Sequence, residues 1–157
     1  MKKILQVQSL KKYFPIYGGL LSREIGQVKA VDDVTFDINE GEILGLVGES
    51  GCGKTTVGRM TLRLLEPTSG KIFFEETNLL SLKNKMLATI RPKIQIIFQD
   101  PYSSLNPRFT VERLIGEALS VHGLAQGNEL REKIETLMEK VGLSNMYLKR
   151  FPHEVSG

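Results

Sequence analysis

The amino-acid sequence predicts a mixed α/β fold. Extended segments with a period of two open the chain, and an apolar run between glycines precedes apolar residues at helical spacing. The last third carries two amphipathic helical patterns, and no internal repeat or low-complexity tract interrupts the chain. A sheet combined with helices is therefore expected.

The first two extended segments are predicted at residues 4–10 and 28–38. In the second segment Val34, Phe36 and Ile38 stand two residues apart, which is the period of a strand with one buried face. Residues 15–27 lie between the two segments and contain three glycines. They are expected to form a loop or a loose hairpin.

A central strand and a helix are predicted next. Residues 43–47 are apolar and lie between Gly41 and Gly48, which is typical of a strand buried on both faces. From Lys54 onward the apolar residues follow helical spacing until Pro67 and Gly70, which we expect to stop the helix.

Two further strands are predicted at residues 71–74 and 93–98, and two helices at residues 109–121 and 129–141. Gly123 and Gly142 are the expected stops of these helices. One face of the second helix carries apolar side chains that we interpret as core: Leu130, Ile134, Leu137, Met138 and Val141. Residues 74–78 offer no glycine for a turn, so a longer or distorted hairpin is expected there.

The composition is that of an ordinary globular protein. The 157 residues are 41% hydrophobic and 25% charged, which argues against collagen-like and disordered classes. Lysine and arginine number 21 against 18 acidic residues, and the net charge of +3 is scattered along the chain. Composition therefore gives no case for nucleic-acid binding.

Cys52 is the single cysteine, so no internal disulfide is expected, and a reducing compartment fits best. His122 and His153 do not complete a zinc-ligand spacing with it. Polar residues interrupt the N-terminal segment, which does not read as a signal peptide, and no stretch approaches the roughly 18 apolar residues of a membrane helix.

One motif carries chemistry. Residues 48–55 read Gly-Glu-Ser-Gly-Cys-Gly-Lys-Thr, match G-x-x-x-x-G-K-[ST], and lie between a predicted strand and a predicted helix. The glycines let successive main-chain N–H groups point at phosphate, and the helix N-terminus adds partial positive charge. Lys54 is expected to bind the β and γ phosphates and Thr55 to ligate Mg²⁺. The alternative, a glycine-rich loop with a chance lysine, is disfavoured by the flanking elements.

Two other polar residues accompany this loop. Cys52 is interpreted as a small residue that fits the loop, with a reactive thiol shielded by bound nucleotide as the alternative. Gln99 follows the predicted strand 93–98 and opens a loop rich in proline, serine and asparagine. Its side-chain amide could ligate Mg²⁺ or hold a water near the γ-phosphate.

These residues resemble the ATP-binding subunits of ATP-binding-cassette (ABC) transporters, specifically those of bacterial oligopeptide and dipeptide importers. The resemblance covers nearly the whole chain and rests on residues 30–38, 48–56, 98–101, 104–108 and 151–157. The Ser-Leu-Asn-Pro stretch from Ser104 is its most specific part. Together with Tyr102 and Arg108, it resembles the second of the two paired ATPase subunits more than the first.

The resemblance implies a P-loop NTPase fold of the ABC ATPase type over residues 1–157, with an N-terminal antiparallel β segment. It implies a phosphate loop at 48–56, a Q-loop at 99–108 and a helical subdomain at about 109–157. ATP and Mg²⁺ are the implied cofactors. The implied binding residues are Phe14, Gly48, Glu49, Ser50, Gly51, Cys52, Gly53, Lys54, Thr55, Thr56 and Gln99, with Thr55 and Gln99 on the metal.

Phe14 is the implied aromatic partner of adenine. Tyr13 is the alternative if the register differs by one residue, and core packing is the other role open to either ring. Residues 155–157 resemble the start of the family signature motif, and Val155 stands where leucine is commoner.

The implied partners are transmembrane permease subunits, contacted through the loop at 100–108, and a second homologous ATPase subunit. This places the protein at the cytoplasmic face of the inner membrane. Neither nucleic-acid binding nor direct lipid insertion is expected. An ordinary solvent loop is the alternative reading of residues 100–108.

In the family, the Walker B strand, the glutamate that polarises water and the switch histidine all follow the signature motif. We therefore expect a domain that is truncated before the Walker B strand and carries no catalytic residue in these 157 residues. Strand 93–98 would lack a neighbour and expose an aggregation-prone edge. Weak ATP binding, no hydrolysis and poor solubility are expected of this chain alone.

Three functions remain open. The first is the energy-coupling ATPase subunit of a peptide importer, and the second is a non-catalytic truncated product that binds nucleotide or the membrane subunit without turnover. The third is a GTPase or small-molecule kinase. A GTPase needs Asn-Lys-x-Asp to read guanine, and Asn84-Lys85-Met86-Leu87 lacks the aspartate.

Overall fold

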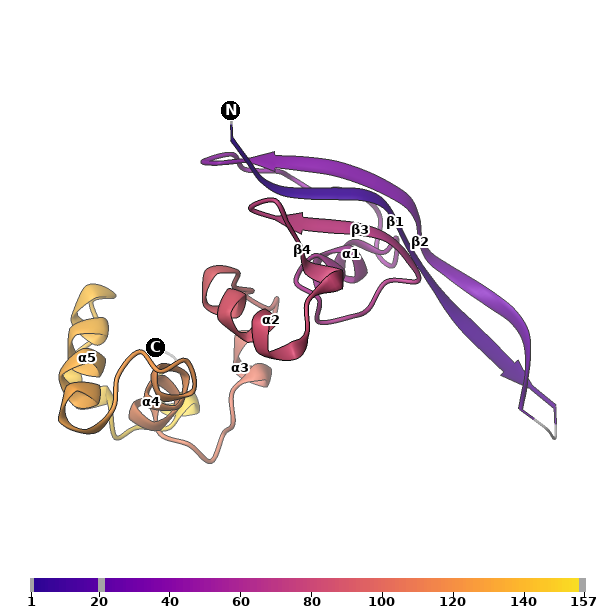
Figure 1. Cartoon of the computed structure of the whole chain (residues 1–157). Coiled ribbons are helices and arrows are strands. Elements are labelled where there is room, and N and C mark those ends of the chain that lie inside the picture. Colours follow the sequence, from indigo (N-terminus) through magenta and orange to yellow (C-terminus); the bar gives the residue numbers. More distant parts are fainter. Residues whose placement is uncertain (1, 20–21, 156–157) are drawn as a thin grey trace. The chain divides into compact units, whose positions relative to one another are not determined.

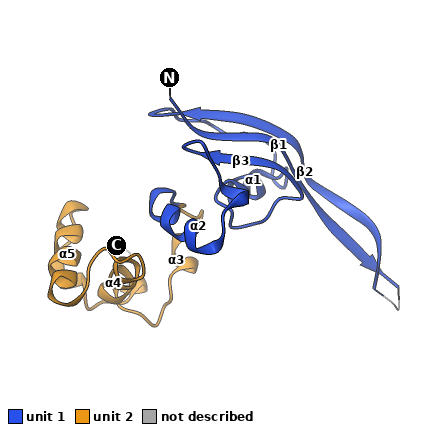
Figure 2. Cartoon of the chain, viewed as in Figure 1, with its two compact units in different colours: residues 1–95 blue, residues 96–157 orange. Residues whose placement is uncertain are grey.

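The structure, a computed structural model, describes residues 2–19 and 22–155 (Figure 1). The chain divides into two compact units, residues 1–95 and residues 96–157 (Figure 2). Each unit is described by itself.

The first unit is built on a four-stranded antiparallel sheet in the order β2-β1-β3-β4. β1 (Lys3–Gly18) pairs with β2 (Arg23–Asn39) along its whole length, and β3 (Ser69–Phe74) pairs with residues 5–11 of β1. The far half of the β1–β2 hairpin therefore extends beyond β3 as an arm (Figure 1).

Of the two forms predicted for residues 15–27, the hairpin is confirmed and the loop is wrong. The strands continue to the Gly18–Arg23 pair, so most of these residues are strand. The apolar side chains of Phe14 and Val28 lie directly opposite each other across the two strands. Such cross-strand pairs favour continued pairing, which the glycine count obscured.

The core of this unit lies between the sheet and α1 (Lys54–Thr61). Its buried side chains are Val7, Leu10, Val31, Val57, Met60, Ile72, Phe74 and Leu79. The predicted helix at Lys54 is confirmed, but it ends at Thr61 rather than near Pro67. The chain reverses just beyond that end, where Arg63 adopts a positive φ of 48°.

Two predicted strands do not form in the part of the chain that the structure describes. Residues 43–47 carry no strand, and the side chains of Ile43 and Val47 are 96% and 90% exposed. Residues 93–98 carry no strand either. Lys93 is the last residue of the 3-10 helix η2 (Arg91–Lys93), and Ile97 is 90% exposed. A strand needs a neighbouring backbone to bond to, and neither segment is paired with one among the described residues. The aggregation-prone strand edge expected at 93–98 is accordingly not present as a strand.

The hairpin between β3 and β4 (Thr77–Asn78) is also different from the prediction. It is closed by only two residues, Glu75 and Glu76, with φ values of 46° and 68°. The turn is therefore tight rather than lengthened. Positive φ at both positions is the geometry that suits the strand twist, and two glutamates adopt it at a cost in strain. The predicted strand at 71–74 is confirmed as β3.

Two short elements complete the first unit: the 3-10 helix η1 (Leu79–Ser81) and α2 (Asn84–Ile90). The Asn78 side chain starts η1 by accepting a hydrogen bond from the Leu80 N–H at 3.0 Å. α2 buries Leu87.

The second unit is helical. It contains α3 (Pro101–Ser104), α4 (Val111–Val121), α5 (Gly127–Lys140) and the 3-10 helices η3 (Asn145–Tyr147) and η4 (Pro152–Glu154). α4 and α5 confirm the two predicted helices, and their buried core is formed by Leu119, Ile134, Met138 and Leu148. Val141, predicted on the core face, is instead 68% exposed because α5 ends at Lys140. In the described residues no helix combines the length and the hydropathy needed to span a membrane.

Candidate nucleotide-binding site

The phosphate-loop motif forms an exposed loop that is seated on the sheet. Gly51 and Gly53 adopt φ values of 82° and 94°, in the region that side chains disfavour. A Cβ on Gly53 would lie 2.4 Å from the carbonyl oxygen of Ala30 in β2. Glycine at position 53 is thus required twice, by its backbone conformation and by its contact with the strand.

The loop leads directly into the N-terminus of α1. The helical hydrogen bonds begin with the Val57 N–H, which donates to the Gly53 carbonyl at 2.9 Å. The N–H groups of Lys54, Thr55 and Thr56 precede that bond, and no acidic residue lies in the first turn. A helix end of this kind favours an anion through its N–H groups and its dipole.

The Lys54 ammonium lies within the loop. It donates to the carbonyls of Gly48 at 2.7 Å and Glu49 at 2.6 Å, and its Nζ is 3.5 Å from Cys52 Sγ. The Cys52 N–H donates to the Glu49 carbonyl at 3.3 Å. The positive charge of Lys54 and the main-chain dipoles of residues 48–53 therefore lie together at the start of α1.

Phe14 and Tyr13 lie on opposite faces of β1. The register shifts on either side of Lys12, but Lys12 lies opposite the buried Val31 of the core that includes α1, and Phe14 follows two residues later on the same face. Lys12 Nζ lies 5.0 Å from the Phe14 ring centroid and also donates to the Glu66 carbonyl at 2.8 Å. Phe14 is 40% exposed, so neighbouring side chains do not enclose its ring.

Tyr13 is held on the other face by a charged cluster. Its hydroxyl donates to Asp32, and Lys29 Nζ lies 5.3 Å from its ring centroid. This hydrogen bond raises the pKa of Tyr13 and lowers the pKa of Asp32, which Lys29 and Lys11 lower further. Of the two aromatic residues, Phe14 is thus the one on the α1 face.

Gln99 belongs to the second unit. It is exposed and directly precedes Asp100, whose side chain caps α3 by accepting from the Ser103 N–H at 3.3 Å. The structure places Phe14 and residues 48–56 in the first unit and Gln99 in the second. Val155 is half-buried after η4, and Ser156 and Gly157 lie outside the described residues.

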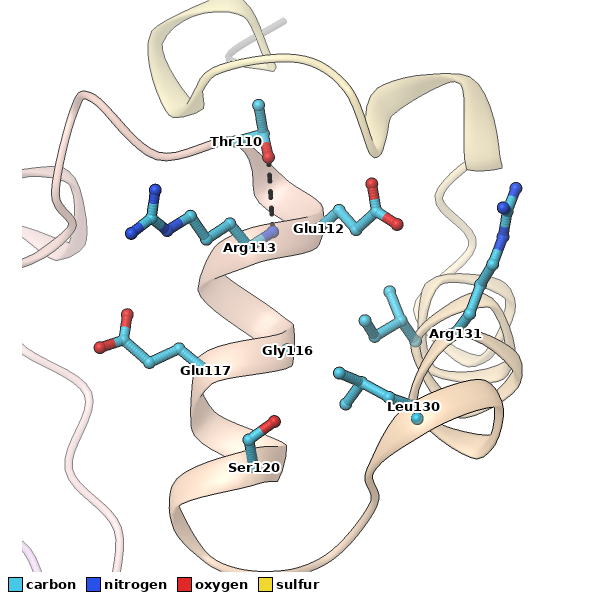
Figure 3. A pocket seen from close by; sticks show the side chains of 10 residues that line it. Thr110, Glu112, Arg113, Gly116, Glu117, Ser120, Leu130 and Arg131 are labelled. Atoms are coloured by element: carbon cyan, nitrogen blue, oxygen red, sulfur yellow. Dashed lines mark hydrogen bonds between the residues drawn. The ribbon is translucent and has the colours of Figure 1, made fainter.

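A groove of about 660 Å³ runs between α4 and α5 in the second unit (Figure 3). Gly116, Leu130 and Ile134 form its apolar floor, and a Cβ on Gly116 would stand 3.4 Å from Ile134 Cδ1. Charged side chains lie around it, including Glu112, Glu117, Arg113 and Arg131. None of the residues predicted to bind nucleotide lines this groove.

Among the described residues, no three or more His, Cys, Asp or Glu side chains gather where they could hold a metal ion. The predicted ligands are of another kind. The Thr55 hydroxyl is exposed at the start of α1, beside the loop that would hold the phosphates. A threonine hydroxyl beside phosphate oxygens suits Mg²⁺, which is usually bound through few protein ligands plus substrate phosphates.

Sequence reasoning missed two contributors to this site. Ala30 acts through its backbone carbonyl, which gives no side-chain signature. Asp32 acts on Tyr13, and its position in a charged stretch gave no sign of a partner across the hairpin.

The chain was compared with known proteins. The ABC transporter family matches residues 31–157. The oligopeptide transport ATP-binding protein AppF of Bacillus subtilis is 47% identical over 98% of this chain and 47% of its own length. The dipeptide transport ATP-binding protein DppF of Haemophilus influenzae is 43% identical over 98% of this chain and 47% of its own length.

The fold matches as well. The ATP-binding cassette MJ0796, solved as a dimer bound to ADP and phosphate, superposes with a TM-score of 0.76 at 22% identity, over 97% of this chain and 63% of that one. The chain spans about half the length of the curated transport ATP-binding proteins named above. The matched residues include the phosphate loop, Gln99 and both amphipathic helices, and the chain therefore belongs to the ABC transporter family, as an ATP-binding domain with the ABC ATPase fold.

Proposed function

We propose that residues 48–56 bind the phosphates of Mg-ATP. The observation that carries the proposal is the exposed loop whose glycine is seated on β2 and whose lysine ammonium lies at the N-terminus of α1. Main-chain N–H groups from Gly48 to Gly53 would face the phosphates. Lys54 would exchange its carbonyl contacts for phosphate oxygens, which is favourable because both partners are then charged.

We assign the remaining roles from position for Thr55, Thr56 and Phe14, and from the family resemblance for Gln99. The N–H groups of Thr55 and Thr56 extend the phosphate site, and the Thr55 hydroxyl and Gln99 would hold the Mg²⁺ that neutralises phosphate charge. Phe14 would stack on adenine, because it lies on the α1 face of β1 with an accessible ring. Tyr13, tied to Asp32 on the opposite face, is the weaker candidate.

At the level of the whole protein, we propose the energy-coupling ATPase subunit of a peptide importer. The support is the identity to oligopeptide and dipeptide transport ATP-binding proteins over nearly the whole chain. ATP hydrolysis, contact of residues 100–108 with permease subunits, pairing with a second ATPase subunit and a location at the cytoplasmic face of the inner membrane belong to this proposal.

The proposal is tested by titrating the chain with a fluorescent ATP analogue in the presence of Mg²⁺. Lys54→Ala removes a charge-assisted contact of about 1.5–3 kcal/mol, so affinity should fall roughly ten- to hundredfold. Lys85→Ala, an exposed lysine of α2, is the matched control and should bind like the wild type. Competition with GTP separates this function from a GTPase. Unchanged affinity in Lys54→Ala would refute the assignment.

A further inference from the structure

Two arginines meet at the C-terminal end of α1. Arg63 follows the helix, and its Nη1 donates to the carbonyls of Leu79 at 2.9 Å and Leu82 at 2.7 Å. Its side chain is only 14% exposed. Arg63 therefore links the end of α1 to η1 and to Leu82, the residue after η1.

Arg91, which comes later in the sequence, reaches back to the same helix end. Its Nη1 donates to the Leu62 carbonyl at 2.7 Å and its Nη2 donates to the Arg63 carbonyl at 3.0 Å. These carbonyls come directly after the last residue of α1, where a helix leaves acceptors unpaired and where a cation is favourable. Because both donors belong to one planar guanidinium, the contact fixes orientation as well as distance.

Arg91 also begins the segment that leads to Gln99. It is the first residue of η2, and its own carbonyl accepts from the Gln95 side chain at 2.9 Å. Four residues after Gln95 the chain reaches Gln99. Arg91 is thus the residue that joins the end of α1 to the stretch of chain carrying the proposed Mg²⁺ ligand.

We propose that Arg91 is a positioning residue that couples nucleotide binding at the phosphate loop to residues 91–95, which lead to Gln99. The inference rests on the proposed function, because it needs a ligand at the start of α1. α1 has only eight residues, about two helical turns, so its two ends lie close together. In this proposal the order that a ligand imposes at the start of α1 passes along the helix, and the two-point guanidinium contact carries it into η2.

Hydrogen exchange measured by mass spectrometry tests this coupling on the purified 157-residue chain, with and without Mg-ATP. In the wild type, Mg-ATP should slow exchange at residues 48–57 and, by about fivefold or more, at residues 91–95, a segment that excludes the proposed ligand Gln99. Arg91→Gln should keep the slowing at 48–57 and lose it at 91–95. Lys93→Gln is the matched control, because it removes a positive charge from the same 3-10 helix but contacts Glu75 instead of α1. It should behave like the wild type.

The outcomes separate the two proposals. If Mg-ATP slows exchange at neither segment of the wild type, the proposed function fails and the coupling fails with it. If residues 48–57 respond but residues 91–95 respond equally in the wild type and in Arg91→Gln, or do not respond in either, the coupling alone is overturned. Should Arg91→Gln lose its cooperative unfolding, Arg91→Lys serves instead, since an ammonium lacks the two-point contact. A full response at 91–95 in Arg91→Lys contradicts the proposal, and a reduced one supports it.

Discussion

The close contact between Gly53 of the phosphate loop and Ala30 of β2 can be tested by adding a single methyl group at position 53. In Gly53→Ala the new Cβ would lie 2.4 Å from the Ala30 carbonyl oxygen and 3.5 Å from Val31 Cγ2. The first distance is about 1 Å below an ordinary contact, so either the loop or the strand must move. The φ of 94° adds strain for any residue with a side chain.

The magnitude follows from these two effects. A left-handed conformation costs a residue with a Cβ about 1–2 kcal/mol, and overpacking against a rigid backbone costs about 1–3 kcal/mol. Gly53→Ala should therefore lower the free energy of unfolding by about 2–5 kcal/mol. If the loop escapes this cost by leaving β2, the expected result is instead a loss of ATP affinity.

Gly58→Ala is the matched control within the same helix. Apart from the neighbouring residues and backbone of its own helix, no atom lies within 4 Å of the position its Cβ would take, and Gly58 lies within α1. Alanine should therefore stabilise the helix by about 0.8–1 kcal/mol. Urea unfolding followed by circular dichroism, together with ATP titration, measures both variants. If Gly53→Ala matched the wild type in stability and in affinity, the proposed seating of the loop would be wrong.

The other predictions concern the hairpins of the first unit. Glu76→Gly relieves a φ of 68° and keeps Glu75 paired with Lys93 at 3.0 Å. It should raise the free energy of unfolding by about 0.5–1 kcal/mol and with it the urea midpoint, and a lower midpoint would contradict the strain argument. Asp32 has a folded-state pKa below its ordinary 3.8, so its stabilisation is present above that pH and is lost as the pH falls through the lower folded value. Asp32→Asn should flatten the acid side of a melting-temperature profile, and an unchanged profile would show that the Tyr13 contact does not stabilise the arm.

Much of the fold can be predicted from local patterns. α4 and α5 follow from apolar residues at helical spacing, and β3 from a short apolar run beside glycine. The phosphate loop is predictable because its chemistry is contiguous in sequence. Phe14 came from the family resemblance, Gln99 came from its place after a predicted strand together with that resemblance, and the roles of both remain predictions.

What the sequence could not show depends on partners far away in the chain. Residues 43–47 and 93–98 have the composition of buried strands, but composition cannot supply the backbone that a strand must pair with. The contact of Gly53 with Ala30 and those of Arg91 with two carbonyls use backbone oxygens, which every residue possesses. No pattern of side chains marks such acceptors.

The long β1–β2 hairpin has a consequence for the order of folding. Its strands are neighbours in sequence, so pairing them closes a short loop, whereas pairing β1 with β3 must close one of about sixty residues at a higher entropic cost. The hairpin can therefore form first, and it contains the Ala30 carbonyl on which Gly53 later rests. A newly made chain would acquire the template for its phosphate loop before the loop itself has left the ribosome.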